Sequence, residues 1–167
     1  MLPLPVTAEG HGVLLTVAYD GRGLAGFARQ RDARTVAGEL EGALREIDPR
    51  VSDVRGASRT DSGVHARGQR VAFDPDAVRP LSAWVHGVAR HLPDAIVVRR
   101  AARVARGFVP RFNARSKHYR YVLLADGIRD PFFAGRAWRI AELRRDDALA
   151  RASAEASAAV GTHDFAA

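Results

Sequence analysis

The chain contains no cysteine, almost no lysine and no long apolar run among its 167 residues. The lack of cysteine excludes disulfide frameworks, cysteine-ligated zinc, iron–sulfur clusters and thiol catalysis. No apolar run approaches the roughly 18 residues that a membrane-spanning helix needs. Residues 1–6 lack the charged start and long apolar stretch of a secretory signal. We therefore expect a soluble, cytoplasmic protein that does not associate with a membrane.

The charge balance is strongly basic and is carried almost entirely by arginine. Lys and Arg number 26 against 19 Asp and Glu, so the formal net charge is +7, and Lys117 is the single lysine. Guanidinium groups match phosphate geometry and stack on bases, so nucleic acid is the leading class of partner. A GC-rich genome also replaces lysine by arginine without regard to function. Charge alone therefore leaves both nucleic-acid binding and an ordinary solvated surface open.

The length and the apolar patterns predict one α+β domain. Alternating or continuous apolar residues predict strands at 12–19, 51–57, 68–73, 95–104 and 116–124. Apolar residues at helical spacing predict helices at 35–47, 80–92 and 143–160, the first capped by Thr35 and the last followed by Gly161. Helices interleaved with strands that short loops join favour a mixed or antiparallel sheet with helices packed on one face.

The densest group of reactive side chains is the segment 58–66, between two predicted strands. Loops that a rigid sheet positions are common places for catalytic groups. The carboxylate of Asp61 fits a general base or a nucleophile, provided that a cation keeps it ionised and water is excluded. Arg59 is two residues away and supplies such a cation, and Gly63 allows a sharp turn. The residues alone leave open that Asp61 merely caps a turn with Thr60 and Ser62.

Four segments, in one order, carry a resemblance to the tRNA pseudouridine synthase A family. Residues 59–66, R-T-D-S-G-V-H-A, are similar to its R-T-D-x-G-V-H-A signature. Residues 19–27 resemble its Y-D-G-x-x-x-x-G-[WF] motif. Residues 108–114 resemble its F-x-A-R-F-S-A segment and lead into the Tyr-x-Tyr run at 119–121. Residues 161–165 resemble its G-x-[HN]-D-F motif, so the likeness runs from about residue 12 to the end of the sequence.

The resemblance implies isomerisation of uridine to pseudouridine at tRNA positions 38, 39 and 40, in the anticodon stem-loop, without any cofactor or metal. It also implies that Asp61 is the catalytic carboxylate. Three chemical routes stay open: Asp61 adds to the base, attacks the sugar, or takes a proton so that a glycal forms. In each route the target base must leave the stacked stem and enter a pocket.

The resemblance also implies roles for three further residues of the site. Arg59 matches the arginine that pairs with the aspartate and assists base flipping. Tyr119 matches the tyrosine that stacks on the flipped base, although its pattern alone favours a half-buried strand aromatic. Arg111 matches a cation that contacts the RNA backbone or the rim of the active site. His65 is expected to hold the loop, because one imidazole and one carboxylate are too few for a metal centre.

Family enzymes are longer, work as homodimers and have a second half that resembles the first. We therefore expect residues 1–11 to be a flexible N-terminus and residues 12–167 to be an N-terminal catalytic domain, with the C-terminal domain missing. A non-catalytic tRNA-binding or RNA-binding module that retains the fold is the alternative, and the complete motif around Asp61 argues against it. A glycosidase-like hydrolase needs a second carboxylate, and none stands in a motif with Asp61.

Overall fold

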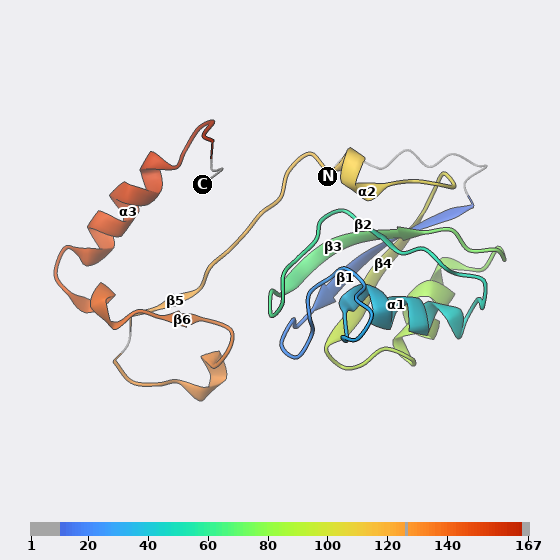
Figure 1. Ribbon diagram of the computed structural model, residues 1–167, viewed down its shortest axis with the longest axis horizontal. Coiled ribbons are helices and arrows are strands. Elements are labelled where there is room, and N and C mark those ends of the chain that lie inside the picture. Colours follow the sequence, from blue (N-terminus) through green and yellow to red (C-terminus); the bar gives the residue numbers. More distant parts are fainter. Residues whose placement is uncertain (1–10, 126, 165–167) are drawn as a thin grey trace. The chain divides into compact units, whose positions relative to one another are not determined.

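The computed structural model describes residues 11–125 and 127–164 (Figure 1). The chain forms two compact units, with the boundary between Lys117 and His118. The expected flexible N-terminus falls almost wholly outside the described residues. No helix of the described chain is long and apolar enough to cross a lipid bilayer.

The first unit is built on a four-stranded antiparallel sheet with the order β2-β3-β1-β4. Its strands are β1 (Gly12–Tyr19), β2 (Arg55–Gly56), β3 (Ala66–Phe73) and β4 (Ile96–Val104). The central strand, β1, is bordered by β3 and β4, and its side chains Val13, Leu15 and Val17 are fully buried. The α+β class and the antiparallel sheet predicted from the sequence are confirmed.

One face of this sheet is covered by α1 (Val36–Arg45), whose apolar stripe packs on β1 (Figure 1). Thr35 caps the helix as expected, because its hydroxyl accepts a hydrogen bond from the Gly38 N–H at 3.2 Å. Val36, Leu40 and Leu44 are fully buried within this core.

The predicted helix at 80–92 forms over a shorter stretch, as the π-helical turn η1 (Ala83–Gly87) with a helical residue pair on each side. Trp84 is fully buried and lies edge-on to Phe73, with ring centroids 5.0 Å apart and an interplanar angle of 75°. The edge-to-face pair fixes η1 against β3.

The strand predicted at 51–57 is wrong over most of its length, since only the two residues of β2 pair with β3. Val51 is buried as the pattern indicated, but its carbonyl accepts from the Arg45 side chain at 2.8 Å. Its N–H donates to the Asp48 carbonyl at 3.1 Å. A strand extends only where a neighbouring strand takes up these backbone groups, so residues 51–54 form no regular secondary structure.

Asp48 joins the end of α1 to the loop after β3 through its carboxylate. The side chain is buried, with 4% exposure. One oxygen accepts from the Arg50 N–H at 3.2 Å, and the other accepts from the N–H groups of Asp76 at 2.7 Å and Ala77 at 3.1 Å. These bonds satisfy backbone donors from two segments that are distant in the sequence.

We expect Asp48→Ala to lower the free energy of unfolding by about 2 kcal/mol, because three backbone donors lose a charged acceptor. Urea denaturation of the purified chain measures the loss. The matched control is Asp94→Ala, at an exposed carboxylate for which no partner is seen in the described chain. That variant is expected to stay within about 0.5 kcal/mol of the unchanged protein. Equal stabilities of the two variants would show that the Asp48 bonds contribute nothing.

The second unit contains the parallel pair β5 (Leu123–Leu124) and β6 (Trp138–Arg139). Its helices are η2 (Pro131–Phe133), η3 (Ala141–Arg144) and α3 (Ala148–Ala158). The strand predicted at 116–124 is therefore wrong for residues 116–122, which form no strand. Among them, Val122 alone bonds to a strand in the described chain, since its carbonyl accepts from the Trp138 N–H of β6 at 2.8 Å. The helix predicted at 143–160 is shorter, because Leu143 belongs to η3 and Ala159 is the C-cap.

Candidate active site

The loop at 57–65 connects β2 to β3 and carries Asp61. It lies at the end of the sheet where Tyr19 pairs with Ala66 on one side and with Ile96 on the other. Asp61 is exposed. The sheet therefore holds both ends of the loop while its middle extends beyond the strands.

A second loop, residues 20–34 after β1, packs along the Asp61 loop and fixes it from both sides of the aspartate. Before Asp61, Thr60 is held twice: its hydroxyl lies 2.8 Å from the Tyr19 hydroxyl, and its carbonyl accepts from the Phe27 N–H at 2.9 Å. After Asp61, the Leu24 carbonyl accepts from the Ser62 hydroxyl at 3.2 Å and from the Gly63 N–H at 3.3 Å. The backbone on each side of Asp61 is thus tied to the same neighbouring loop.

Two glycines allow the loops to approach this closely. Gly26 has φ +93°, and a Cβ there would lie 2.5 Å from the Thr60 carbonyl oxygen. A Cβ at Gly21 would collide with the carbonyl of Val64. Glycine is needed at both positions because any side chain would push the two loops apart.

The base of the loop is fixed by Gln69 on β3. This side chain is 8% exposed, and its amide donates to the Ser58 carbonyl at 2.6 Å. The Ser58 carbonyl lies in the loop and has no partner from the pairing of β2 with β3, so the buried Gln69 amide supplies its hydrogen bond. Gln69 lies shortly after the R-T-D segment in the sequence, but its partner Ser58 is 11 residues away and could not be read from the pattern.

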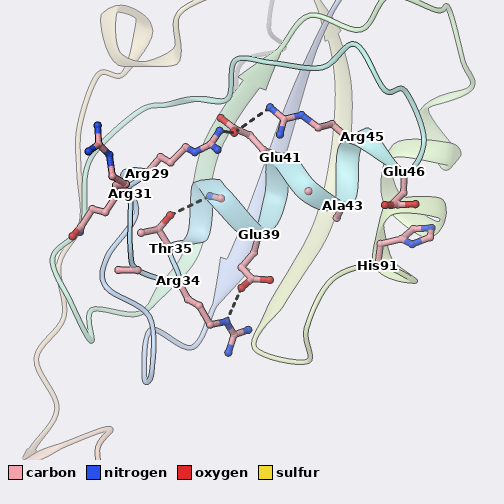
Figure 2. Close-up of a pocket in the computed structure, with 14 residues that line it drawn as sticks. Arg29, Arg31, Arg34, Thr35, Glu39, Glu41, Ala43, Arg45, Glu46 and His91 are labelled. Atoms are coloured by element: carbon pink, nitrogen blue, oxygen red, sulfur yellow. Dashed lines mark hydrogen bonds and ion pairs between the residues drawn. The ribbon is translucent and has the colours of Figure 1, made fainter.

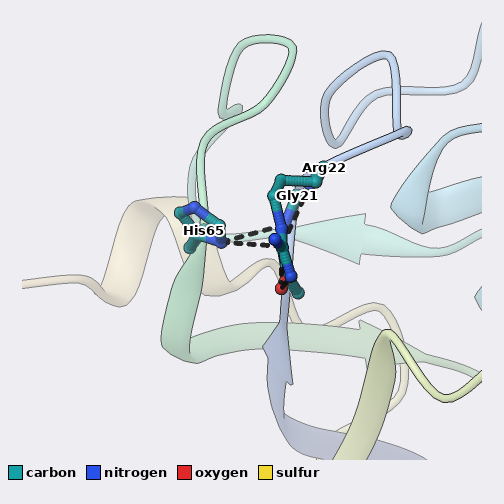
Figure 3. Close-up of polar contacts among 4 residues, drawn as sticks. Gly21, Arg22 and His65 are labelled. Atoms are coloured by element: carbon teal, nitrogen blue, oxygen red, sulfur yellow. Dashed lines mark hydrogen bonds and ion pairs between the residues drawn. The ribbon is translucent and has the colours of Figure 1, made fainter. Parts of the chain in front are cut away.

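His65 closes the other end of the loop, as Figure 3 shows. Its Nδ1 lies 3.2 Å from the Gly21 N–H and 3.1 Å from Asp20 Oδ1. The Gly21 N–H donates to Nδ1, so the imidazole joins the end of the Asp61 loop to the start of the 20–34 loop. His65 thus holds the loop, in line with the expectation from the sequence.

Arg22 secures Asp20 in turn through two parallel bonds. Its Nε lies 3.0 Å from Oδ1 and its Nη2 lies 2.6 Å from Oδ2. The hydrogen bond to Asp20, together with the attraction of that carboxylate, raises the pKa of the Arg22 guanidinium. The charged fork fixes the turn that begins the second loop.

The side chains of Asp61 and Arg59 are both exposed, and neither makes a hydrogen bond or an ion pair within the described chain. The pair expected between them is therefore not formed in this structure. The backbone of Asp61 is fixed, whereas its carboxylate stays available to a ligand. Such a group is suited to nucleophilic or base chemistry once a partner excludes water from it.

Arg111 lies at the other end of the sheet from Asp61. It belongs to α2 (Pro110–Asn113), a four-residue helix that contacts β2 and β3. Phe108, just before α2, packs on Leu14 and Ala72. Five strand residues separate Leu14 from Tyr19 along β1, which corresponds to about 17 Å. The structure thus brings Arg59 and Asp61 into one loop and does not bring Arg111 to them.

Tyr119 belongs to the second unit, where its side chain is 65% exposed. The predicted G-x-[HN]-D-F match ends at Phe165, which lies outside the described residues.

A hollow of about 530 Å³ runs beside α1, lined by charged side chains from the 20–34 loop and from the helix (Figure 2). Glu41, with 8% side-chain exposure, lies between Arg29 at 2.5 Å and Arg45 at 3.5 Å. Arg34 pairs with Glu39 at 2.8 Å. These ion pairs use both glutamates and tie the 20–34 loop to the helix, so we assign the hollow a structural role. Asp61 does not line it.

Within the described residues, no three His, Asp or Glu side chains gather as they would around a metal ion. Asp61 is the one carboxylate of the loop at 57–65. Its position rests on a pair of loops whose contacts link residues as far apart as Tyr19 and Thr60.

An antiparallel sheet covered by helix on one face, with an R-T-D loop fixed by a Y-D-G loop, is the arrangement expected for the N-terminal half of a pseudouridine synthase. A sequence profile described as tRNA pseudouridine synthase matches residues 15–113, which include Arg59, Asp61 and Arg111. The chain belongs to the tRNA pseudouridine synthase family.

Curated relatives agree with this assignment. A protein of Geobacter sp. (strain M21) named tRNA pseudouridine synthase A is 42% identical over 155 residues, which are 93% of this chain and 62% of the relative. A protein with the same name from Neisseria meningitidis serogroup C (strain 053442) is 44% identical over 132 residues, 78% of this chain and 50% of the relative. The chain thus spans between 50% and 62% of the length of these two relatives.

Proposed function

We propose that this chain is the aspartate-bearing portion of an enzyme that isomerises uridine to pseudouridine in tRNA, at positions 38, 39 and 40 of the anticodon stem-loop. The observation that carries the proposal is the geometry of the Asp61 loop. Hydrogen bonds from a second loop hold the backbone before and after Asp61, yet the carboxylate has no partner within the described chain. A residue with a fixed backbone and an uncommitted functional group is suited to catalysis.

The reaction exchanges one bond to the sugar for another. The C1′–N1 bond breaks, uracil rotates in its pocket, and C5 bonds to C1′. The proton on C5 is lost and N1 gains one, so the atoms balance without an outside reagent. Asp61 serves as the carboxylate in this sequence, either by adding to the base, by attacking C1′ or by accepting a proton.

The target base is stacked in the stem and must be extruded before Asp61 reaches it. Arg59 is exposed and has no partner in the described chain, so its guanidinium is available to fill the space that the base leaves. It also supplies positive charge two residues from Asp61. The exposed ring of Tyr119 is assigned to stacking on the flipped base. We assign Arg111, also exposed, to the RNA backbone.

The test is release of tritium from tRNA labelled at C5 of uridine, followed by mapping of pseudouridine to positions 38–40. The chain is compared with a longer polypeptide that continues through the family's C-terminal portion. We expect the longer polypeptide to turn over and the 167-residue chain to be weak or inactive, because Asp61 is exposed to water in this chain. Equal rates would contradict the desolvation argument.

A longer polypeptide that binds tRNA without releasing tritium would instead identify an RNA-binding module that retains the fold. A salt-dependent affinity would accompany it, since phosphate contacts dominate such binding. The homodimer and the cytoplasmic location implied by the family stay predictions.

A further inference from the structure

A partly buried ion pair lies at the end of the sheet opposite Asp61. It joins Arg55 on β2 to Asp74, the residue that follows β3, with Nη2 and Oδ2 2.9 Å apart. The two side chains are 17% and 18% exposed. Neither residue belongs to the four family motifs in the sequence, and neither was singled out from it.

Each nitrogen of the Arg55 guanidinium is used by a different group. Nε donates to the Phe108 carbonyl at 3.1 Å, Nη1 donates to Asp53 at 2.7 Å, and Nη2 donates to Asp74. Burial disfavours the charged guanidinium, but the hydrogen bonds and charges of Asp53 and Asp74 outweigh it and raise the pKa of Arg55. The planar fork is therefore charged and held in one orientation.

Asp74 completes the arrangement from the other side. Both of its oxygens lie 3.1 Å from the Gly107 N–H, which donates to them. Gly107 has φ +74°, so the turn between β4 and α2 adopts a conformation that favours glycine. The two side chains thus bond to consecutive residues of this turn: Asp74 accepts from the Gly107 N–H, and Arg55 donates to the Phe108 carbonyl.

The turn leads directly into α2. The Phe108 side chain packs on Leu14, Ala72 and Val104, and Pro110 begins the helix two residues later. A four-residue helix is too short to hold its own direction in solution. The direction of α2, and with it the place of Arg111, is therefore set by the turn that Arg55 and Asp74 hold.

We propose that Arg55 and Asp74 are positioning residues that hold α2 so that Arg111 meets the tRNA backbone at a second contact, about 17 Å along the sheet from the Asp61 loop. This inference rests on the proposed function. A contact so far from the reacting base supports binding and register of the tRNA and does not take part in the isomerisation. It should therefore act on KM and leave kcat unchanged.

The test is Arg55→Lys, which keeps the charge but lacks Nε and the planar fork. In the polypeptide that turns over, we expect KM for tRNA to rise about fivefold to tenfold with kcat unchanged, and the salt dependence of tRNA binding to weaken by about one phosphate contact. Arg111→Ala should do the same, and adding it to Arg55→Lys should cause little further loss, because both changes remove one contact. Asp74→Asn is the second variant, to be used if the lysine variant fails to fold.

The matched control is Arg106→Lys, in the same turn, where the side chain is exposed and has no partner in the described chain. We expect this control to leave KM and the salt dependence unchanged. Amide hydrogen exchange over 107–114 reports on the turn itself and should accelerate in Arg55→Lys but not in the control.

The outcomes separate the two proposals. Faster exchange in Arg55→Lys with unchanged KM and salt dependence would mean that the ion pair only stabilises the fold, and the inference would be overturned. Fully additive losses in the double variant would overturn it as well. If the unchanged longer polypeptide neither binds tRNA nor releases tritium, the proposed function fails, and the inference fails with it.

Discussion

Asp61→Asn is expected to lower pseudouridine formation by roughly a thousandfold or more, while tRNA affinity stays within about twofold. Asparagine has nearly the same shape as aspartate but is neither a nucleophile nor a base. The Asp61 carboxylate makes no hydrogen bond or ion pair within the described chain, so its replacement removes no intramolecular bond there. Tritium release measures the reaction and filter binding measures the affinity.

The matched control for this experiment is Asp94→Asn, which makes the same chemical change at an exposed aspartate outside the loop. It should retain full activity. Both variants should unfold within about 0.5 kcal/mol of the unchanged protein. A variant at Asp61 that keeps a tenth or more of the activity would remove this residue from the chemistry.

The two loops explain why the Y-D-G and R-T-D segments occur together in one sequence. Tyr19 and Thr60 are 41 residues apart, and Gly21 and His65 are 44 residues apart, yet each pair is in contact. The first segment is the support on which the second is held. A substitution in either segment should therefore disturb the same carboxylate, even though only one of them carries it.

The sequence predicted well those strands and helices whose buried face follows from the spacing of their own apolar residues. Alternation along 12–19 and helical spacing over 35–47 correspond to β1 and α1, because each buries one continuous face against the core. The strand predictions for residues 51–54 and 116–122 were wrong for the same reason. Their apolar residues suggested strands, but strand formation depends on a partner elsewhere in the chain, and local pattern carries no information about it.

The candidate site divides in the same way. Asp61 and Arg59 were identified from the motif, and the structure places them in one exposed loop. Arg111 was expected at the RNA backbone or the rim of the active site, and the packing of Phe108 and α2 puts it at the far end of the sheet. Arg55 and Asp74 were missed because their contacts span 19 and 53 residues and involve backbone groups.

Gly26→Ala is expected to lower kcat by roughly a hundredfold, through displacement of the Asp61 loop. The added Cβ would lie 2.5 Å from the Thr60 carbonyl oxygen and 3.2 Å from the Asp61 carbonyl carbon. These are backbone atoms, so no side-chain rotation relieves the collision, and the residue next to Asp61 must move. Displacement also costs the hydrogen bond between the Phe27 N–H and the Thr60 carbonyl.

The expected loss of kcat comes from the collision and not from backbone strain alone. Gly23→Ala is the matched control, because it introduces the strain without the collision. Gly23 has φ +74°, in the same left-handed region as Gly26, but a Cβ there meets nothing within 4 Å. Both alanines cost about 1 kcal/mol of folding free energy for their conformation, and only the one at Gly26 adds the collision with Thr60. We therefore expect Gly23→Ala to lose stability but keep kcat within about twofold, measured by urea denaturation and by tritium release at saturating tRNA. Equal kcat values for the two variants would mean that contact between the loops does not determine the position of Asp61.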